Sequence, residues 1–185
     1  MPEEASEKVN PLYVVMGVSG SGKTTVARLL ARATGGKWLD ADDFHPEENR
    51  AKMSVGIPLT DEDRQPWLDR LNAELRAAAS QSQPVFLACS ALKQKYRDRL
   101  GAGLPQIRFV YLKGSRELIH SRLVLRKHHF MPASLMESQF ADLEEPADAI
   151  VLDVSRTEEE VLGDFRRLTS AGGGPAGRVI PPSAG

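Results

Sequence analysis

The chain has 185 residues, 41% of them hydrophobic and 26% charged, and its formal net charge is −1. This length suits one domain with a substantial core. The near-neutral charge excludes the broad basic surface that nucleic-acid binding usually requires, so we expect no nucleic-acid partner. No apolar stretch is long enough to span a bilayer, and the acidic start lacks an apolar signal core. Both features predict a cytoplasmic protein with no membrane partner.

The first predicted strand leads straight into a complete phosphate-binding motif. Residues 17–24 read G-V-S-G-S-G-K-T, and a helix-like stretch follows. A strand that ends in glycine-rich turns and opens a helix directs backbone N–H groups at a polyphosphate. We therefore expect Lys23 to reach the β- and γ-phosphates of ATP and the Thr24 hydroxyl to bind Mg²⁺. The predicted nucleotide-binding residues here are Gly17, Val18, Ser19, Gly20, Ser21, Gly22, Lys23, Thr24 and Thr25.

Apolar, strand-like runs alternate with amphipathic stretches along the rest of the chain. This alternation predicts an α/β fold in which helices cover both faces of a parallel sheet, with ligands at the carboxyl ends of the strands. The polar start, residues 1–10, and the Gly/Pro-rich tail, residues 170–185, are expected to be disordered around a domain at 11–169. The expected strands are residues 12–18, 38–39, 85–89, 107–112 and 150–154, and the expected helices are 24–33, 64–79, 92–100, 117–126 and 158–168.

Carboxylates and an imidazole crowd together after the short second strand, at Asp40, Asp42, Asp43 and His45. The third strand ends without the acid that many phosphate-loop proteins use for magnesium. We therefore expect Asp40 to hold Mg²⁺ through water and Asp42 to act on the acceptor hydroxyl as a catalytic group. The same residues also suit an Asx-rich turn that caps the next helix, Asp43 above all, and this alternative stays open.

Several further blocks, in a fixed order, make the chain resemble the gluconokinases of the P-loop kinase superfamily. The resemblance runs from about residue 12 to residue 168. It implies ATP-dependent phosphorylation of D-gluconate to 6-phosphogluconate and a three-layer, shikimate-kinase-like fold with sheet order 2-3-1-4-5. It also implies a helical lid and suggests a homodimer. The blocks are D-A-D-D-F-H-P-E-E-N at 40–49, K-M at 52–53, G-I-P-L-T-D-E-D-R-Q-P-W at 56–67, C-S-A-L-K at 89–93 with Y-R-D at 96–98, and H-F-M-P at 129–132.

A gluconate pocket needs a cation for the carboxylate and short polar groups for the hydroxyls. Arg64, Lys93 and Arg97 are the candidate cations, and guanidinium groups favour Arg64 and Arg97 because they can bind a carboxylate through two hydrogen bonds. His45 is a candidate ligand of a hydroxyl, and the resemblance adds His129. As an alternative, the three cations are solvated helix charges that pair with nearby acids.

The basic segment 121–135 is the expected lid. Arg122 and Arg126 are four residues apart, hence on one helix face, and either could reach the phosphates. Position in the family favours Arg126 as the catalytic cation, with Arg122 among the nucleotide-binding residues; the alternative is a basic helix end at the negative pole of the helix dipole. His128 stands where the family commonly has a small residue, which leaves the hinge geometry open. Neither His128 nor His129 has a spacing partner for zinc.

Other functions compete with this interpretation. Another P-loop kinase, acting on shikimate or a nucleoside monophosphate, would share the phosphate loop but not the 40–49 and 56–67 blocks. A nucleotide-dependent switch that reads guanine would carry an Asn-Lys-x-Asp element, which the sequence lacks. Trp38, Trp67 and the single cysteine, Cys89, are expected in the core rather than in the site.

Overall fold

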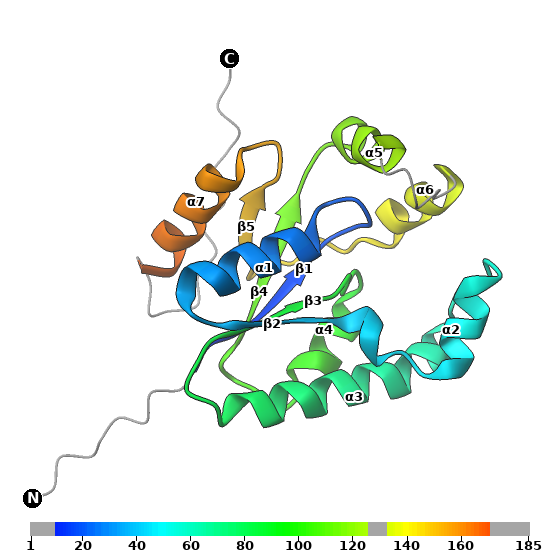
Figure 1. The fold of residues 1–185 in the computed structure, drawn as a ribbon. Coiled ribbons are helices and arrows are strands. Elements are labelled where there is room, and N and C mark those ends of the chain that lie inside the picture. The colour runs from blue at the N-terminus through cyan, green and yellow to red at the C-terminus, as the bar shows by residue number, and fades with distance from the viewer. Residues whose placement is uncertain (1–9, 126–132, 171–185) are drawn as a thin grey trace, which may run out of the picture.

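The computed structural model describes residues 10–125 and 133–170. Its centre is a five-stranded sheet in the order β2-β3-β1-β4-β5, with every neighbouring pair parallel (Figure 1). This order confirms the prediction from the family resemblance. The strands are β1 (Leu12–Met16), β2 (Lys37–Asp40), β3 (Val85–Ala88), β4 (Ile107–Lys113) and β5 (Ile150–Asp153).

Helices flank the sheet on both faces and make three layers. Figure 1 shows α1 and α7 on one side and α3 and α4 on the other, while α2, α5 and α6 lie beyond the carboxyl ends of the strands. The described helices are α1 (Lys23–Thr34), α2 (Glu47–Ser54), α3 (Asp61–Ala79), α4 (Gln94–Gly101), α5 (Arg116–Leu125), α6 (Ala133–Asp142) and α7 (Glu158–Ser170), with a 3₁₀ helix, η1 (Ala41–Phe44).

Alternate residues of β1 point into two separate cores. Tyr13 and Val15 pack with α1 and α7, whereas Leu12 and Val14 pack with α3 and α4. Every residue of β1 is buried, as expected for the central strand of a sheet covered on both faces. Because β1 is fixed from both sides, the phosphate loop that follows it starts from a rigid support.

Helix α3 starts at a capping box formed by Thr60 and Asp63. Thr60 Oγ1 accepts from the backbone N–H of Asp63, and Asp63 Oδ2 accepts from the backbone N–H of Thr60, at 3.2 and 3.0 Å. These two bonds satisfy N–H groups at the start of α3 that have no partner within the helix. Asp43 does not cap α2, whose N-cap is Pro46.

Two aromatic residues behave differently from each other. Trp67 is buried, as predicted, but the prediction for Trp38 is wrong, because 40% of this residue is exposed. Trp38 lies on β2, at the edge of the sheet, where the Arg28 guanidinium lies 5.4 Å from its ring centre. Cys89 is buried, as expected.

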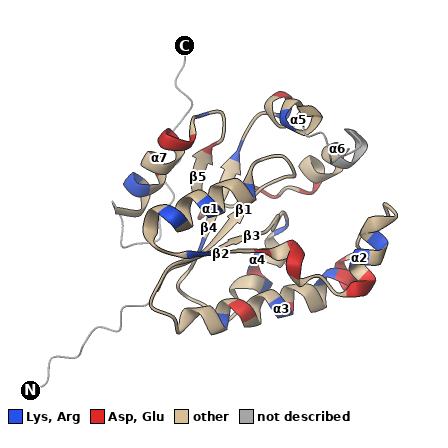
Figure 2. Cartoon of the chain, viewed as in Figure 1, with Lys and Arg blue, Asp and Glu red and all other residues tan. Residues whose placement is uncertain are grey.

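Charges of both signs are interspersed along the helices in the view of Figure 2. None of the helices in the two described ranges is long and apolar enough to span a membrane.

Candidate active site

The phosphate loop joins β1 to α1 along a path that requires glycine. Gly17, Gly20 and Gly22 have φ angles of 148°, 86° and 91°, which other residues rarely adopt. A Cβ atom on Gly20 would lie 2.8 Å from Cγ of Leu123, so the loop packs directly against α5. On the other side, the Gly17 N–H donates to the Ser90 carbonyl, just past β3, at 3.2 Å. The sheet and α5 together hold the loop in one shape.

Two polar groups of the loop suit an anionic ligand. Lys23 Nζ donates to the Val18 carbonyl at 3.1 Å, which brings the ammonium group back over the loop. Ser21 is fully buried, and within the described residues its hydroxyl is the buried side-chain polar atom without a hydrogen-bond partner. An unpaired buried hydroxyl costs on the order of 1–3 kcal/mol. An incoming ligand that bonds to this hydroxyl would therefore be stabilised.

Thr24 and Asp40 meet at the start of α1. Thr24 Oγ1 donates to Asp40 Oδ2 at 2.9 Å. The other carboxylate oxygen, Oδ1, accepts from the backbone N–H of Asp42 at 3.1 Å and so caps η1. The cap interpretation and the magnesium interpretation of Asp40 are therefore compatible. The same carboxylate caps η1 and also lies beside the Thr24 hydroxyl. Hydroxyl and carboxylate oxygens are the ligands that Mg²⁺ prefers, so this pair fits that ion.

His45 is a buried, neutral histidine. Its ring stacks on Trp67 with ring centres 4.2 Å apart, and Trp67 Nε1 donates to the Ala41 carbonyl at 2.8 Å. Burial first, and then repulsion from Arg50 and Arg64, lowers the pKa of His45 to about 4. Its Nδ1 lies 3.5 Å from the Asn49 amide nitrogen, which can only donate. In the neutral ring Nδ1 then accepts, and the proton lies on Nε2.

That Nε2 atom faces Asp42, 3.9 Å from its Oδ1. The Asp42 side chain is 86% exposed, yet its pKa is raised. Partial desolvation by the surrounding protein is the largest cause, and repulsion from Asp40 adds to it, while attraction to Lys23 opposes the shift. Asp42 therefore lies within electrostatic reach of the phosphate loop and next to a neutral hydrogen-bond donor.

Cations gather around the ring of Tyr96 on α4. The Arg64 guanidinium and the Lys93 and Lys95 ammonium groups lie 5.6, 5.9 and 5.8 Å from the ring centre. The Tyr96 hydroxyl donates to Asp61, and burial is the largest cause that raises the pKa of Tyr96 to about 12. The structure thus brings together Arg64 and Lys93, two of the predicted substrate cations, at one aromatic ring.

Arg97, the third predicted cation, is used inside the protein. It is only 3% exposed, and its Nη1 donates to the carbonyls of Ala91 and Leu92, both at 2.9 Å. Its Nη2 donates to Gln94 Oε1 at 2.8 Å. Ala91 has a φ of 46°, an unusual value for a residue with a side chain. The geometry therefore differs from the predicted substrate contact, because the guanidinium supports the turn that carries Lys93.

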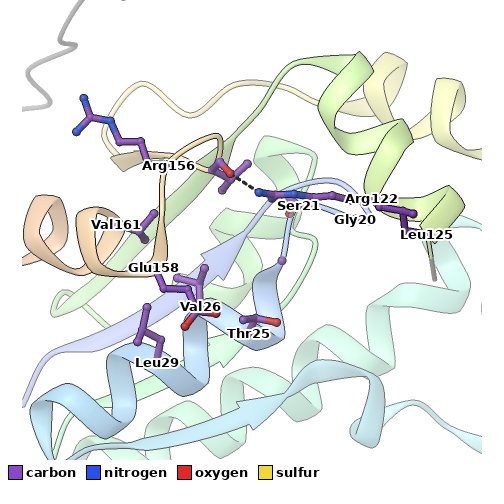
Figure 3. A pocket seen from close by; sticks show the side chains of 12 residues that line it. Gly20, Ser21, Thr25, Val26, Leu29, Arg122, Leu125, Arg156, Glu158 and Val161 are labelled. Atoms are coloured by element: carbon purple, nitrogen blue, oxygen red, sulfur yellow. Dashed lines mark hydrogen bonds between the residues drawn. The ribbon is translucent and has the colours of Figure 1, made fainter. Parts of the chain in front are cut away.

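A cleft of about 340 Å³ opens beside the phosphate loop (Figure 3). Its walls come from α1, α5 and the turn between β5 and α7. Arg122 Nη2 donates to the Val154 carbonyl across the cleft, so Arg122 lines this cleft and is bonded to the β5–α7 side. Its lining combines apolar side chains with polar and charged ones, a mixture that suits the base and the sugar of a nucleotide. The cleft is lined by Gly20, Ser21, Gly22, Thr25, Val26, Leu29, Arg122, Leu125, Val154, Arg156, Glu158 and Val161.

Two predicted site residues cannot be placed, and two other residues near the site were not predicted from the sequence. The predicted residues Arg126 and His129 lie outside the described residues. Gln139 on α6 contacts the phosphate loop through the Ser19 backbone N–H, and Asn49 contacts His45. Asn49 lies in the 40–49 block, so the sequence carried a signal for it. Gln139 lies in a helix that the periodicity did not reveal.

Comparisons with known proteins agree with this geometry. A family model described as an AAA domain matches residues 12–149. The thermosensitive gluconokinase of Escherichia coli (strain K12) is 42% identical over 163 residues, which cover 86% of this chain and 87% of the relative. A probable gluconokinase of Mus musculus is 50% identical over 153 residues, which cover 74% and 83%. The crystal structure of a gluconokinase from Sinorhizobium meliloti 1021 matches with a TM-score of 0.75 and 39% identity, over 89% of this chain and 97% of that one.

The sheet order and the relatives point to the same conclusion as the sequence blocks. The matches extend over nearly the full length of these relatives, well beyond the phosphate loop. They therefore include the segments around Asp42, His45, Arg64 and Lys93 as well as the nucleotide side. The chain belongs to the gluconokinase family of P-loop kinases.

Proposed function

We propose that the chain is an ATP-dependent gluconokinase that converts D-gluconate to 6-phospho-D-gluconate. The observation that carries the proposal is the meeting of Thr24 and Asp40 at 2.9 Å, which joins the phosphate loop to the acidic turn after β2. That junction sets a nucleotide site beside groups suited to an acceptor alcohol. Family membership supports gluconate as the acceptor.

On the nucleotide side, the loop amides, Lys23 and the buried Ser21 hydroxyl hold the phosphates of ATP. The cleft lined by Arg122 holds the nucleoside. Thr24 and Asp40 would hold Mg²⁺, Asp40 through water as the sequence predicts, and the ion would neutralise charge on the phosphates of ATP. Arg126, as the sequence predicts, supplies a further positive charge.

On the acceptor side, Arg64 and Lys93 bind the carboxylate of the sugar acid, and the Arg97 guanidinium keeps the Lys93 turn in place. His45 Nε2 donates a hydrogen bond to a substrate hydroxyl. Asp42 accepts the proton of the hydroxyl that attacks the phosphorus, and its raised pKa makes it a better base than an ordinary aspartate. Catalysis then rests on alignment and charge neutralisation. His129 and a homodimeric, cytoplasmic state remain part of the proposal on sequence grounds alone.

A coupled assay with ATP and Mg²⁺ tests the proposal against a panel of gluconate, shikimate, glycerate and nucleoside monophosphates. We expect turnover with gluconate at a kcat/KM at least about a hundredfold above the other acceptors, because a pocket built to pair polar groups rejects ligands that leave them unpaired. Preferred turnover of another acceptor would contradict gluconate specificity. Slow, acceptor-independent hydrolysis alone would favour a nucleotide switch.

A further inference from the structure

One helix contacts both the nucleotide side and the acceptor side of the site. At the nucleotide side, the backbone N–H of Ser19 donates to Gln139 Oε1 at 2.6 Å, and Gln139 Nε2 lies 3.4 Å from Ser19 Oγ. The two residues are 120 positions apart in the sequence. This is a two-point contact between the middle of the phosphate loop and α6.

The last residues of α6, one turn beyond Gln139, are bonded to the turn that carries Lys93. Asp142, three residues after Gln139 and hence near the same helix face, lies 3.4 Å from Lys93 Nζ. Just beyond the helix, the backbone N–H of Glu144 donates to the Leu92 carbonyl at 2.9 Å, and Glu144 Oε2 accepts from the backbone N–H of Gln94 at 2.6 Å. The Glu144 carboxylate thereby binds a free N–H group at the start of α4.

The helix is also packed along its length. Met136 is buried in the core that α1 and α5 share, and the Arg116 guanidinium lies 4.9 Å from the ring centre of Phe140. Gln139 and Asp142 lie one turn apart in this packed helix, so a shift of the phosphate loop is transmitted through it to the turn that carries Lys93. Phosphoryl transfer requires the acceptor oxygen and the γ-phosphate to align closely, and a misplacement of about 1 Å can lower the rate about a hundredfold.

We propose that Gln139 is a positioning residue for phosphoryl transfer. Through the Ser19 amide it sets the distance between the phosphate loop and the acceptor side, while Asp142 and Glu144, one turn further on, bond to the turn that carries Lys93. The inference rests on the proposed kinase function. Gln139 keeps its bond to Ser19 when ATP is present, since a backbone amide has one hydrogen and cannot bond fully to both partners. The other amides of the loop then hold the phosphates.

The test compares Gln139→Met with Glu137→Gln. Methionine has a similar length but cannot make either hydrogen bond. Glu137 is an exposed residue of the same helix that pairs with Arg116, outside the site. We expect Gln139→Met to lower kcat for gluconate about tenfold or more, with KM for ATP and for gluconate changed less than about threefold. The matched Glu137→Gln variant should keep all three constants.

Two outcomes would overturn the inference. A lower KM for ATP with unchanged kcat would mean that Gln139 competes with a phosphate oxygen for the Ser19 amide. A lower melting temperature with unchanged kinetics would mean that the contact is only structural. If Gln139→Met does not fold, Asp142→Asn tests the contact of the same helix with Lys93, and it should lower kcat rather than only raise KM for gluconate. The wild-type protein separates the hypotheses, because a wild type without gluconate turnover would refute the proposed function itself.

Discussion

Lys23 brings a positive charge to the phosphate loop while contributing little to the core. Its ammonium group bonds to a loop carbonyl and lies within electrostatic reach of Asp42. We expect Lys23→Ala to lower kcat about a hundred- to a thousandfold, because loss of one group that stabilises transition-state charge costs a factor of this size. Circular dichroism and thermal melting should show a folded protein. Near-normal turnover in the coupled assay would remove Lys23 from the site.

Asp42 makes activity and stability respond in opposite directions to one substitution. Its raised pKa means that the ionised carboxylate is less favourable in the folded protein than in the unfolded chain. As pH rises through this pKa, the group therefore reduces stability. Asp42→Asn should lower kcat by about a hundredfold or more, leave ATP affinity nearly unchanged, and slightly raise the melting temperature at pH 7.

The pH profile of the same variant provides a second readout. In the wild type, kcat/KM should fall on the acid side below a pKa above the ordinary aspartate value, because Asp42 must be ionised to accept a proton. This acid limb should disappear in Asp42→Asn. A variant that loses stability but keeps its kcat would instead make Asp42 a structural residue of the turn.

The lowered pKa of His45 predicts that the stability of the folded protein depends on pH. Its pKa is about 4 when folded against 6.5 ordinarily, so the unfolded chain binds the proton first as pH falls. The contribution of neutral His45 to the free energy of unfolding is complete above pH 6.5. It is lost as the pH falls from 6.5 to 4, a change of about 3 kcal/mol. His45→Phe retains a ring against Trp67 but cannot titrate. Urea unfolding across this window should therefore show a shallower pH slope for the variant, and equal slopes would contradict the assignment.

At the scale of elements, the phosphate loop and α5 form one packed unit. Gly20 has a φ of 86°, and a Cβ atom there would lie 2.8 Å from Leu123 Cγ, so Gly20→Ala must displace either the loop or α5. We expect a large loss of ATP affinity, measured by titration, together with a lower melting temperature. Gly163 on α7 is the matched control, because nothing lies within 4 Å of its added Cβ. Gly163→Ala should stabilise the protein by about 0.5–1 kcal/mol and leave ATP binding unchanged.

Elements were predictable where a local pattern determines them. The five strands and the start of α1 follow from apolar runs and a glycine-rich turn, which are readable over a few residues. Helix α6 was not anticipated, and neither was the Gln139 contact with Ser19, because a pair of residues 120 positions apart leaves no periodic trace. The role of Arg97 was not predicted for a related reason. Only the folded β3–α4 turn presents the carbonyls that bind its guanidinium.

At the scale of the whole molecule, the order of the strands decides which predictions hold. Its aromatic side chain alone led to the prediction that Trp38 lies in the core. However, β2 is an edge strand, and Trp38 is 40% exposed beside Arg28. The same order brings the end of β2 next to the end of β3, so that Asp40 reaches Thr24 without a carboxylate on β3. The sequence has no acid at the end of β3, and the sheet order places Asp40, at the end of the neighbouring strand, beside Thr24.

Cys89 directly follows β3, which lies between β2 and β1, and is 2% exposed. Burial is the largest cause that raises the pKa of its thiol to about 12. At neutral pH it therefore carries almost no thiolate, the form that reacts with alkylating reagents and disulfide dyes. Labelling requires the sheet around it to open. Since the chain has no other cysteine, the rate of labelling in a native solution reports how often the sheet around Cys89 opens, without any engineered probe.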